Sequence, residues 1–333
     1  MKSLHRIARP ILSMGGFLMT LMFPNGGGAF AADPPEARFT INNADLFHQL
    51  VPKDARITTL SCDLKGVEGL VWMGGDDGYL VFSEMGRNAL TQWTPGKGFE
   101  TYRHPSFATN GNGVDPQGRI VSCEQGQRRI ARIGENKESI VLADKYDGRR
   151  LNSPNDIAIR SDGVMWFTDP RYGKGFGPQE MDGSYVYRYD PVKAELTIAS
   201  KDFTHPNGIC LSPDEKILYV GNGGPGRLIR AYDIGRNDEL LNGRKICVVS
   251  DGVPDGFKCD RLGNLYVTAG GGVEIFTHSG DFIGAIRTKP RPANVCFGGK
   301  NLKTLFIGGH NCLFSIELQV AGPAPKTRSN GIR

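Results

Sequence analysis

The chain has 333 residues, of which 39% are hydrophobic and 23% charged, so a disordered or fibrous protein is excluded. Its 45 glycines and 20 prolines are typical of many short strands joined by turns and do not suit a helical bundle. The net charge is +5, but three of these charges lie in the first 31 residues. The remaining +2 is too small to indicate a nucleic acid or an anionic membrane as a partner.

The first 31 residues have the pattern of a secretory signal peptide. Lys2, Arg6 and Arg9 precede an apolar run from Ile11 to Phe23, and Ala29-Phe30-Ala31 supplies the small residues of a cleavage site before Ala32. A short membrane anchor is the alternative, but such a run makes only about 20 Å of helix, against a hydrocarbon core of roughly 30 Å. We therefore expect an exported protein, periplasmic or secreted, without stable membrane insertion after cleavage.

The rest of the chain, 32–333, repeats one pattern six times. Each copy has a polar residue, a short apolar strand, a turn with Asp, Gly or Asn, and a second apolar strand. The leading polar residues are Glu68, Asn110, Asn155, Asn207, Asp255 and Asn294. Their spacing of 39 to 52 residues is the period of a propeller blade with four short strands. The pattern predicts an all-β, six-bladed β-propeller in one domain, with its blades over about 56–320.

Further strands are expected between the copies, at 185–189 (half-buried by its alternation), 196–200, 228–232, 245–250, 273–276 and 282–287. After the sixth copy only 312–318 remains, which leaves that blade one strand short. We expect the spare strand at 56–62 to complete it, because closing the ring removes an exposed sheet edge.

Seven cysteines remain after cleavage: Cys62, Cys123, Cys210, Cys247, Cys259, Cys296 and Cys312. The odd number leaves at least one thiol unpaired, and most of them lie in apolar strand-like runs. We expect mainly small buried side chains. A disulfide is the alternative in an oxidising compartment, although the sequence does not identify its partners.

The six leading residues should form a ring around the channel, since equivalent positions of the innermost strands lie at one height. Two carboxylates and four carboxamides, without Cys or His, describe a site for a hard divalent cation. Ca²⁺ is the first choice, with Mg²⁺, Mn²⁺ or Zn²⁺ as alternatives. Such a cation equips the site to hydrolyse an ester-like bond, with a ring carboxylate as general base. The alternative is that these residues only cap strands by bonding local backbone, which explains Glu68 poorly.

Several motifs resemble the gluconolactonase, regucalcin and senescence-marker-protein family. They are E-G-L-V-W (68–72), S-P-N-D-I (153–157), W-F-T-D-P (166–170), H-P-N-G-I (205–209), S-P-D-E-K-I-L-Y-V (212–220) and V-P-D-G (253–256). The resemblance runs from about Ile57 to Leu318. It implies a six-bladed propeller with one axial divalent metal that hydrolyses sugar lactones.

The resemblance also implies roles for single residues. Glu68, Asn207 and Asp255 would hold the metal, Asn155 would lie beside it on the metal or the substrate, and Asp255 would be the general base. Asn110 would contact the substrate, and Asn294 would have a softer role in substrate contact or ring structure.

The chain departs from the family pattern around the mouth of the channel. Glu84 stands where the family has Asp, Gln125 replaces a histidine, and Arg171 stands where a proline is common. Ser153 replaces an arginine of the regucalcin type. We expect Gln125 and Arg171 to contact substrate, and these changes leave hydrolysis plausible while the particular lactone stays open.

Two functions of different classes follow. The first is a metal-dependent lactonase acting on a small sugar lactone. The alternative is a non-catalytic calcium-binding propeller that binds a sugar or a protein at its mouth. An esterase or phosphotriesterase on the same fold is a third interpretation, and the oligomeric state stays open.

Overall fold

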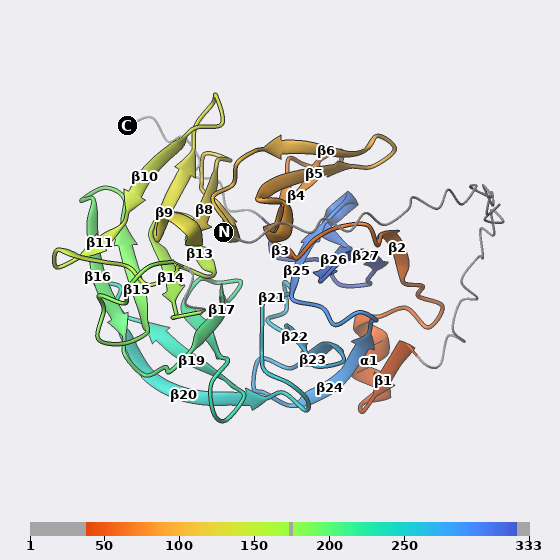
Figure 1. The fold of residues 1–333 in the computed structure, drawn as a ribbon. Coiled ribbons are helices and arrows are strands. Elements are labelled where there is room, and N and C mark those ends of the chain that lie inside the picture. The colour runs from red at the N-terminus through yellow and green to blue at the C-terminus, as the bar shows by residue number, and fades with distance from the viewer. Residues whose placement is uncertain (1–37, 173–175, 325–333) are drawn as a thin grey trace, which may run out of the picture. The chain divides into compact units, whose positions relative to one another are not determined.

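Six small antiparallel sheets stand around a central axis in the computed structural model, which describes residues 38–172 and 176–324 (Figure 1). All described residues belong to a unit of Pro34–Arg333. The preceding Met1–Asp33, and with it the expected signal peptide, lies outside the described residues. The expected six-bladed β-propeller is confirmed.

Each of the first four sheets contains four consecutive strands, with the first strand innermost. Blades 1 and 2 contain β3 Val67–Met73, β4 Tyr79–Glu84, β5 Ala89–Thr94, β6 Gly98–Arg103, and β7 Thr109–Val114, β8 Ile120–Glu124, β9 Arg129–Ile133, β10 Ser139–Ala143. Blades 3 and 4 contain β13 Ile157–Ile159, β14 Met165–Asp169, β15 Tyr185–Asp190, β16 Glu195–Ser200, and β17 Pro206–Leu211, β18 Ile217–Asn222, β19 Leu228–Ile234, β20 Leu240–Val248. A small hairpin of β11 Lys145–Tyr146 and β12 Arg149–Arg150 connects blades 2 and 3.

The last two blades take strands from the N-terminal part of the chain. Blade 5 contains β21 Phe257–Cys259, β22 Leu265–Ala269, β23 Gly272–Phe276, β24 Phe282–Arg287 and, at its edge, β1 Phe39–Ile41. Blade 6 contains β25 Asn294–Gly298, β26 Thr304–Gly309, β27 Cys312–Glu317 and β2 Thr58–Ser61. The sequence did not predict β1 or the helix α1 Ala44–Leu50, because both precede the first repeat.

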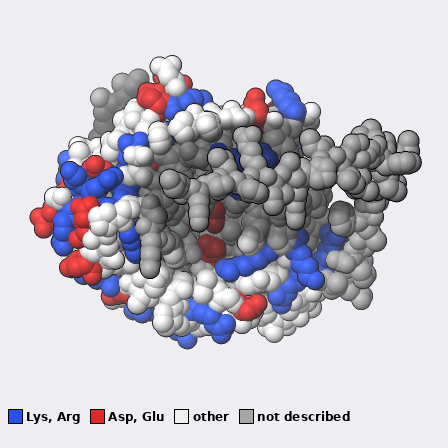
Figure 2. Space-filling view, in the orientation of Figure 1, with Lys and Arg blue, Asp and Glu red and all other residues white. Residues whose placement is uncertain are grey.

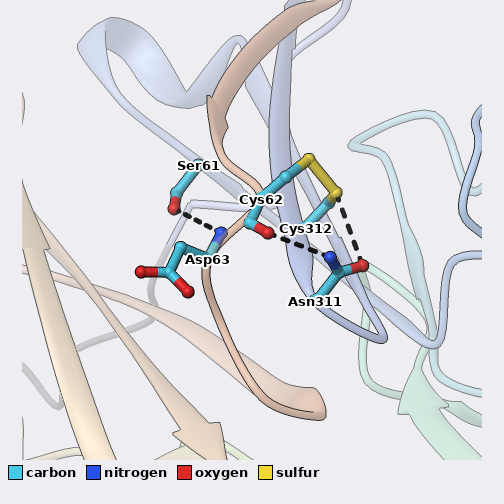
Figure 3. Close-up of a disulfide and its surroundings, with 5 residues drawn as sticks. All are labelled: Ser61, Cys62, Asp63, Asn311 and Cys312. Carbon is cyan, nitrogen blue, oxygen red and sulfur yellow. Dashed lines mark hydrogen bonds between the residues drawn. A yellow bond between two sulfur atoms is a disulfide. The ribbon is translucent and has the colours of Figure 1, made fainter. Parts of the chain in front are cut away.

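The N-terminal strand closes the ring as predicted. β2 pairs antiparallel with β27, with Thr58 opposite Ser315. A disulfide joins Cys62 to Cys312 across a sequence separation of 250 residues, and the Asn311 amide donates a hydrogen bond to the Cys62 carbonyl oxygen (Figure 3). The other five cysteines are free and buried, as expected. The closure therefore combines a sheet pairing with a covalent bond, and this bond would remove chain entropy from the unfolded state.

Neighbouring blades cover both faces of each sheet, and this corrects one prediction. All six residues of β15 are buried, although its alternation predicted a half-buried strand. The reason is that its tyrosines and valine pack against blades 2 and 4, while Arg188 pairs with Asp190 and Asp238. A tryptophan also packs between blades: Trp72 of blade 1 stacks on Phe306 of blade 6.

Candidate active site

The ring residues lie where the innermost strands of neighbouring blades approach most closely. A Cβ on Gly69 would lie 2.1 Å from the Asn110 carbonyl oxygen, and one on Gly208 would lie 2.2 Å from the Asp255 carbonyl oxygen. Side chains larger than hydrogen do not fit at such distances. Glycine directly after the ring residue, which occurs in four of the six repeats, therefore lets the strands converge.

Hydrogen bonds between blades hold the backbone of the ring. The Ser83 hydroxyl donates to the Asn110 carbonyl oxygen (2.7 Å), and the Thr168 hydroxyl donates to that of Asn207 (2.7 Å). The Gly111 amide donates to the Asn155 carbonyl oxygen (2.7 Å). These backbone groups are paired between blades. These hydroxyls were not predicted, although Ser or Thr recurs at the same place of the second strand in four blades.

The side chains of four ring residues form two pairs. The Asn294 amide donates to Glu68 Oε2 at 3.5 Å, and the Asn207 side chain lies close enough to the Asp255 carboxylate to favour its charged form. Asn207 therefore contacts a neighbouring ring residue. Among the described residues no side-chain hydrogen bond of Asn155 or Asn110 is present. The hydrogen bonds that hold these two residues in the ring are those to their backbone carbonyl oxygens.

Asp156 is a third carboxylate at the ring and was not predicted. It stands where most repeats have the glycine, and its Oδ1 accepts from the Ile157 amide at 2.9 Å. Its Oδ2 accepts from the Ile209 amide (3.3 Å) and lies 3.8 Å from the Lys258 ammonium. The departure from glycine at this position was the available signal. Asp156 thus performs the local capping that was the alternative role for its neighbour Asn155.

The carboxylates of the ring oppose each other's ionisation. Burial raises the pKa of Glu68 well above its ordinary value, and the charges of Asp255 and Asp156 add to the increase. Burial also raises the pKa of Asp255 to about 6, although Arg291 and the Asn207 hydrogen bond favour its charged form. A bound divalent cation would favour the charged forms of these carboxylates.

Aromatic and basic side chains surround the ring at the end of the channel that we call the mouth. Tyr172 stacks on His205, with 6.2 Å between the ring centres. Burial and the charges of Asp255 and Glu68 raise the pKa of the Tyr172 hydroxyl. Arg291 Nη2 lies 3.8 Å from Asp255 Oδ2. Figure 2 shows acidic side chains at the base of a central hollow and basic side chains beside them. No repeated position marks Tyr172 or Arg291, because both lie in connections that differ between repeats.

The residues that depart from the family pattern take different positions. Glu84 is buried inside blade 1, where it accepts from the Lys65 amide and the Thr91 hydroxyl, so it has a structural role. Gln125 and Arg171 follow the second strands of blades 2 and 3, at the mouth end. Gln125 Nε2 and Arg171 Nη1 are buried without a hydrogen-bond partner among the described residues. Among the described residues no hydrogen bond or ion pair joins either side chain to a ring residue, so their substrate contacts stay a prediction.

The opposite end of the channel, which we call the lower chamber, is largely apolar, although Asn112 and Lys258 also line it. Its cavity of about 260 Å³ is lined by the later residues of the innermost strands, including Leu70, Trp72, Ile157, Ile209 and Phe297. Among residues 38–172 and 176–324, no helix is long and apolar enough to span a membrane. In the same part of the chain, no three His, Cys, Asp or Glu side chains cluster as a metal site, so a cation at the ring would need amide ligands as well.

The fold and the site define a class: six-bladed propellers with carboxylate and carboxamide side chains around one mouth. The model of the SMP-30/Gluconolactonase/LRE-like family matches residues 67–311, and the chain belongs to this family. The gluconolactonase of Zymomonas mobilis is 32% identical over 295 residues, which cover 80% of this chain and 82% of that protein.

Solved structures agree with this assignment. A gluconolactonase from Xanthomonas campestris is 34% identical, with a TM-score of 0.79 over 84% of this chain and 95% of that one. Regucalcin from Agrobacterium tumefaciens, a calcium-binding protein, is 15% identical with a TM-score of 0.68 over 80% and 95% of the two chains, and shows the fold alone. The relatives confirm the resemblance and the expectation of a lactone-hydrolysing enzyme.

Proposed function

We propose that the protein hydrolyses sugar lactones at the mouth of its channel, with the help of one divalent cation. The observation that carries the proposal is the pairing of the Glu68 and Asp255 carboxylates with the amides of Asn294 and Asn207 around one axis. The family relationship to gluconolactonases supports the choice of a lactone as substrate.

The residues of the ring fit a hard cation. Glu68 and Asp255 supply carboxylate oxygens, Asn155 and Asn207 supply amide oxygens, and these four would hold it. Asn294 Oδ1 is buried without a hydrogen-bond partner among the described residues, so one further amide oxygen is unused near Glu68. Oxygen donors alone favour Ca²⁺, with Mg²⁺, Mn²⁺ and Zn²⁺ as alternatives. A bound cation would supply a Lewis acid for the lactone carbonyl and favour deprotonation of the attacking water.

Asp255 is the proposed general base. Its carboxylate takes a proton from the attacking water while the water oxygen forms a bond to the carbonyl carbon. The bond between this carbon and the ring oxygen then breaks, and Asp255 returns the proton to that oxygen. The product is an open-chain hydroxy acid. Burial raises the pKa of Asp255 without a cation, and a bound cation would favour its ionised form, which is the form a general base needs.

Other residues would orient the sugar. Asn155 and Asn110 lie on neighbouring blades of the ring and would bind hydroxyl groups or the lactone carbonyl. Gln125 and Arg171 would contact the substrate from the rim, since each has a buried nitrogen without a protein partner among the described residues. Buried donors of this kind gain most from a ligand that supplies an acceptor.

The proposal is tested by proton release from glucono-, galactono- and arabinono-lactones. We expect turnover with cation present, its loss after chelation, its return when the cation is added back, and inactivity of Asp255→Asn. Cation binding without turnover of any lactone would favour the non-catalytic alternative, and turnover of aryl esters in preference to lactones would favour the esterase.

We also propose that the protein is exported. The Cys62–Cys312 disulfide supports this, because stable disulfides belong mainly to oxidising compartments. Expression of the full chain in a bacterial host, followed by mass spectrometry of the periplasmic fraction, should give a chain that begins at Ala32. Recovery of the uncleaved chain only from the cytoplasm would contradict export.

A further inference from the structure

Arg291 is a basic residue beside the ring carboxylate of Asp255. It lies in the connection between β24 of blade 5 and β25 of blade 6, three residues before Asn294. Backbone bonds fix this connection on both sides, because the Ala293 amide donates to the Gly308 carbonyl oxygen (2.7 Å) and its carbonyl oxygen accepts from the Gly256 amide (2.8 Å). The backbone that carries Arg291 is therefore held in place at the mouth.

The guanidinium of Arg291 has few protein partners. Its Nη2 donates to the Val253 carbonyl oxygen at 3.3 Å and lies 3.8 Å from Asp255 Oδ2. Among the described residues it makes no other hydrogen bond, although a guanidinium has five N–H donors. Its side chain is 36% exposed, against 22% for Asp255. It is thus accessible to a molecule that enters the mouth.

We propose that Arg291 selects lactones that carry a carboxylate in addition to the lactone group. The proposal rests on the lactonase function proposed above and specifies its substrate class as the lactones of sugar diacids. Arginine is suited to this role, because its planar fork can donate two parallel hydrogen bonds to one carboxylate.

The position of Arg291 favours a carboxylate on the substrate over other partners. Apart from the lactone group, a neutral sugar lactone offers only hydroxyl groups. Amide side chains such as those of Asn110 and Asn155 can bind these groups without a guanidinium. Asp255 alone does not satisfy the guanidinium, since their 3.8 Å separation exceeds hydrogen-bond distance. A substrate carboxylate placed beside Arg291 would accept hydrogen bonds from its unpaired N–H groups while the lactone group lies over the ring.

The test compares a monolactone of glucaric acid, which keeps a free carboxylate, with neutral glucono-delta-lactone. We expect the wild type to have the higher kcat/KM for the glucaric monolactone. In Arg291→Gln the ratio of the two kcat/KM values should fall by about tenfold or more, mainly through KM, because a charge-assisted pair is lost. Arg291→Lys should keep part of the preference, since it retains the charge and loses the fork.

Arg287→Gln is the matched control. It removes the same charge from the last residue of β24, where Arg287 Nε donates to the Thr40 hydroxyl at 2.9 Å on the outer side of blade 5. The ratio should not change in this variant. An unchanged ratio in Arg291→Gln, or an equal loss for both lactones, would overturn the proposal, since the residue would then act only through Asp255.

Binding separates this proposal from the proposed function. If the wild type hydrolyses neither lactone, the lactonase function fails, and calorimetry with glucarate still tests the site. Binding of glucarate that weakens in Arg291→Gln and persists in Arg287→Gln would support a carboxylate site at Arg291. Equal binding by the three proteins, or its absence from the wild type, would overturn it.

Discussion

The two ends of the channel are built from the same six innermost strands but differ in chemistry. At the mouth, the first residues of the strands contribute Glu68, Asp255 and four amides, with Arg291 and Tyr172 beside them. Two to four residues further along, the same strands line the lower chamber mainly with Leu, Ile, Trp and Cys side chains. The comparison teaches that position along the strand separates the proposed catalytic groups from packing residues, so substitutions at the two ends should have different consequences.

The largest expected effect comes from substituting a ring carboxylate. Glu68→Gln keeps the shape but removes a charge from the proposed cation site, so we expect kcat/KM for a lactone to fall by about a hundredfold or more. Cys259→Ala is the control in the lower chamber, where Cys259 Sγ lies 3.5 Å from Cys210 Sγ. It should cost about 1 kcal/mol of stability and leave activity within a few-fold. A larger loss of activity in Cys259→Ala than in Glu68→Gln would contradict the division between the two ends.

Loss of the disulfide should affect stability strongly and extend to the mouth. The His310 carbonyl oxygen accepts from the amides of Gly66 and Val67, directly before Glu68, so the turn that carries Cys312 also positions this carboxylate. Cys62→Ser should lower the free energy of unfolding by about 3–5 kcal/mol and weaken cation binding. Denaturant titration and calorimetry measure the two effects. Cys312→Ser and the double variant should behave alike, and additive losses would show that the cysteines act separately.

A methyl group between two blades should disturb the ring with a smaller effect on stability. In Gly208→Ala the new Cβ would lie 2.2 Å from the Asp255 carbonyl oxygen, so β17 and β21 must separate. We expect a loss of about 2–4 kcal/mol in unfolding free energy together with reduced activity. Gly75→Ala is the matched control, because nothing lies within 4 Å of its Cβ. Equal stability of the two variants would argue against close contact of the blades at the ring.

The last expected effect is a pH dependence of stability at the mouth end of blade 3. Burial raises the pKa of Asp169 to about 7, although the amides of Asn152 and Ser153 donate to its carboxylate. The unfolded chain therefore ionises at lower pH than the folded one. Stability should fall by up to about 1.4 kcal/mol per pH unit between roughly pH 4 and 7, and then level off.

Asp169→Asn isolates this contribution. The variant lacks the titrating group, so the stability advantage of the wild type over it should be larger at pH 5 than at pH 8. Thermal or urea unfolding at the two pH values measures the difference. A constant advantage would mean that Asp169 has an ordinary pKa in the folded protein.

The sequence predicted those features that repeat along the chain. The six blades and the ring position of each leading residue follow from one pattern, because equivalent residues of a propeller lie at one height. Closure by β2 followed from counting strands in the last blade. The prediction that β15 is half-buried was wrong, since alternation within one strand does not show that a second blade covers its other face.

Features that depend on contacts between unequal segments could not be predicted. Tyr172 and Arg291 reach the ring from connections of different length, so no repeat marks them. The pairing of Cys62 with Cys312 was open, because seven cysteines allow many pairs and only the fold brings these two together. Asp156, in contrast, could have been predicted, because it stands at a position where four of the six repeats have glycine.

Calorimetric titration of the chelator-treated protein with Ca²⁺ tests the central claim most directly, because it measures whether the ring binds a cation independently of any substrate. The account predicts one site per chain in the wild type and its loss in both Glu68→Gln and Asp255→Asn, with binding retained in Cys259→Ala. Binding that is unchanged in the two carboxylate variants, or a wild type that binds none of Ca²⁺, Mg²⁺, Mn²⁺ and Zn²⁺, would contradict it.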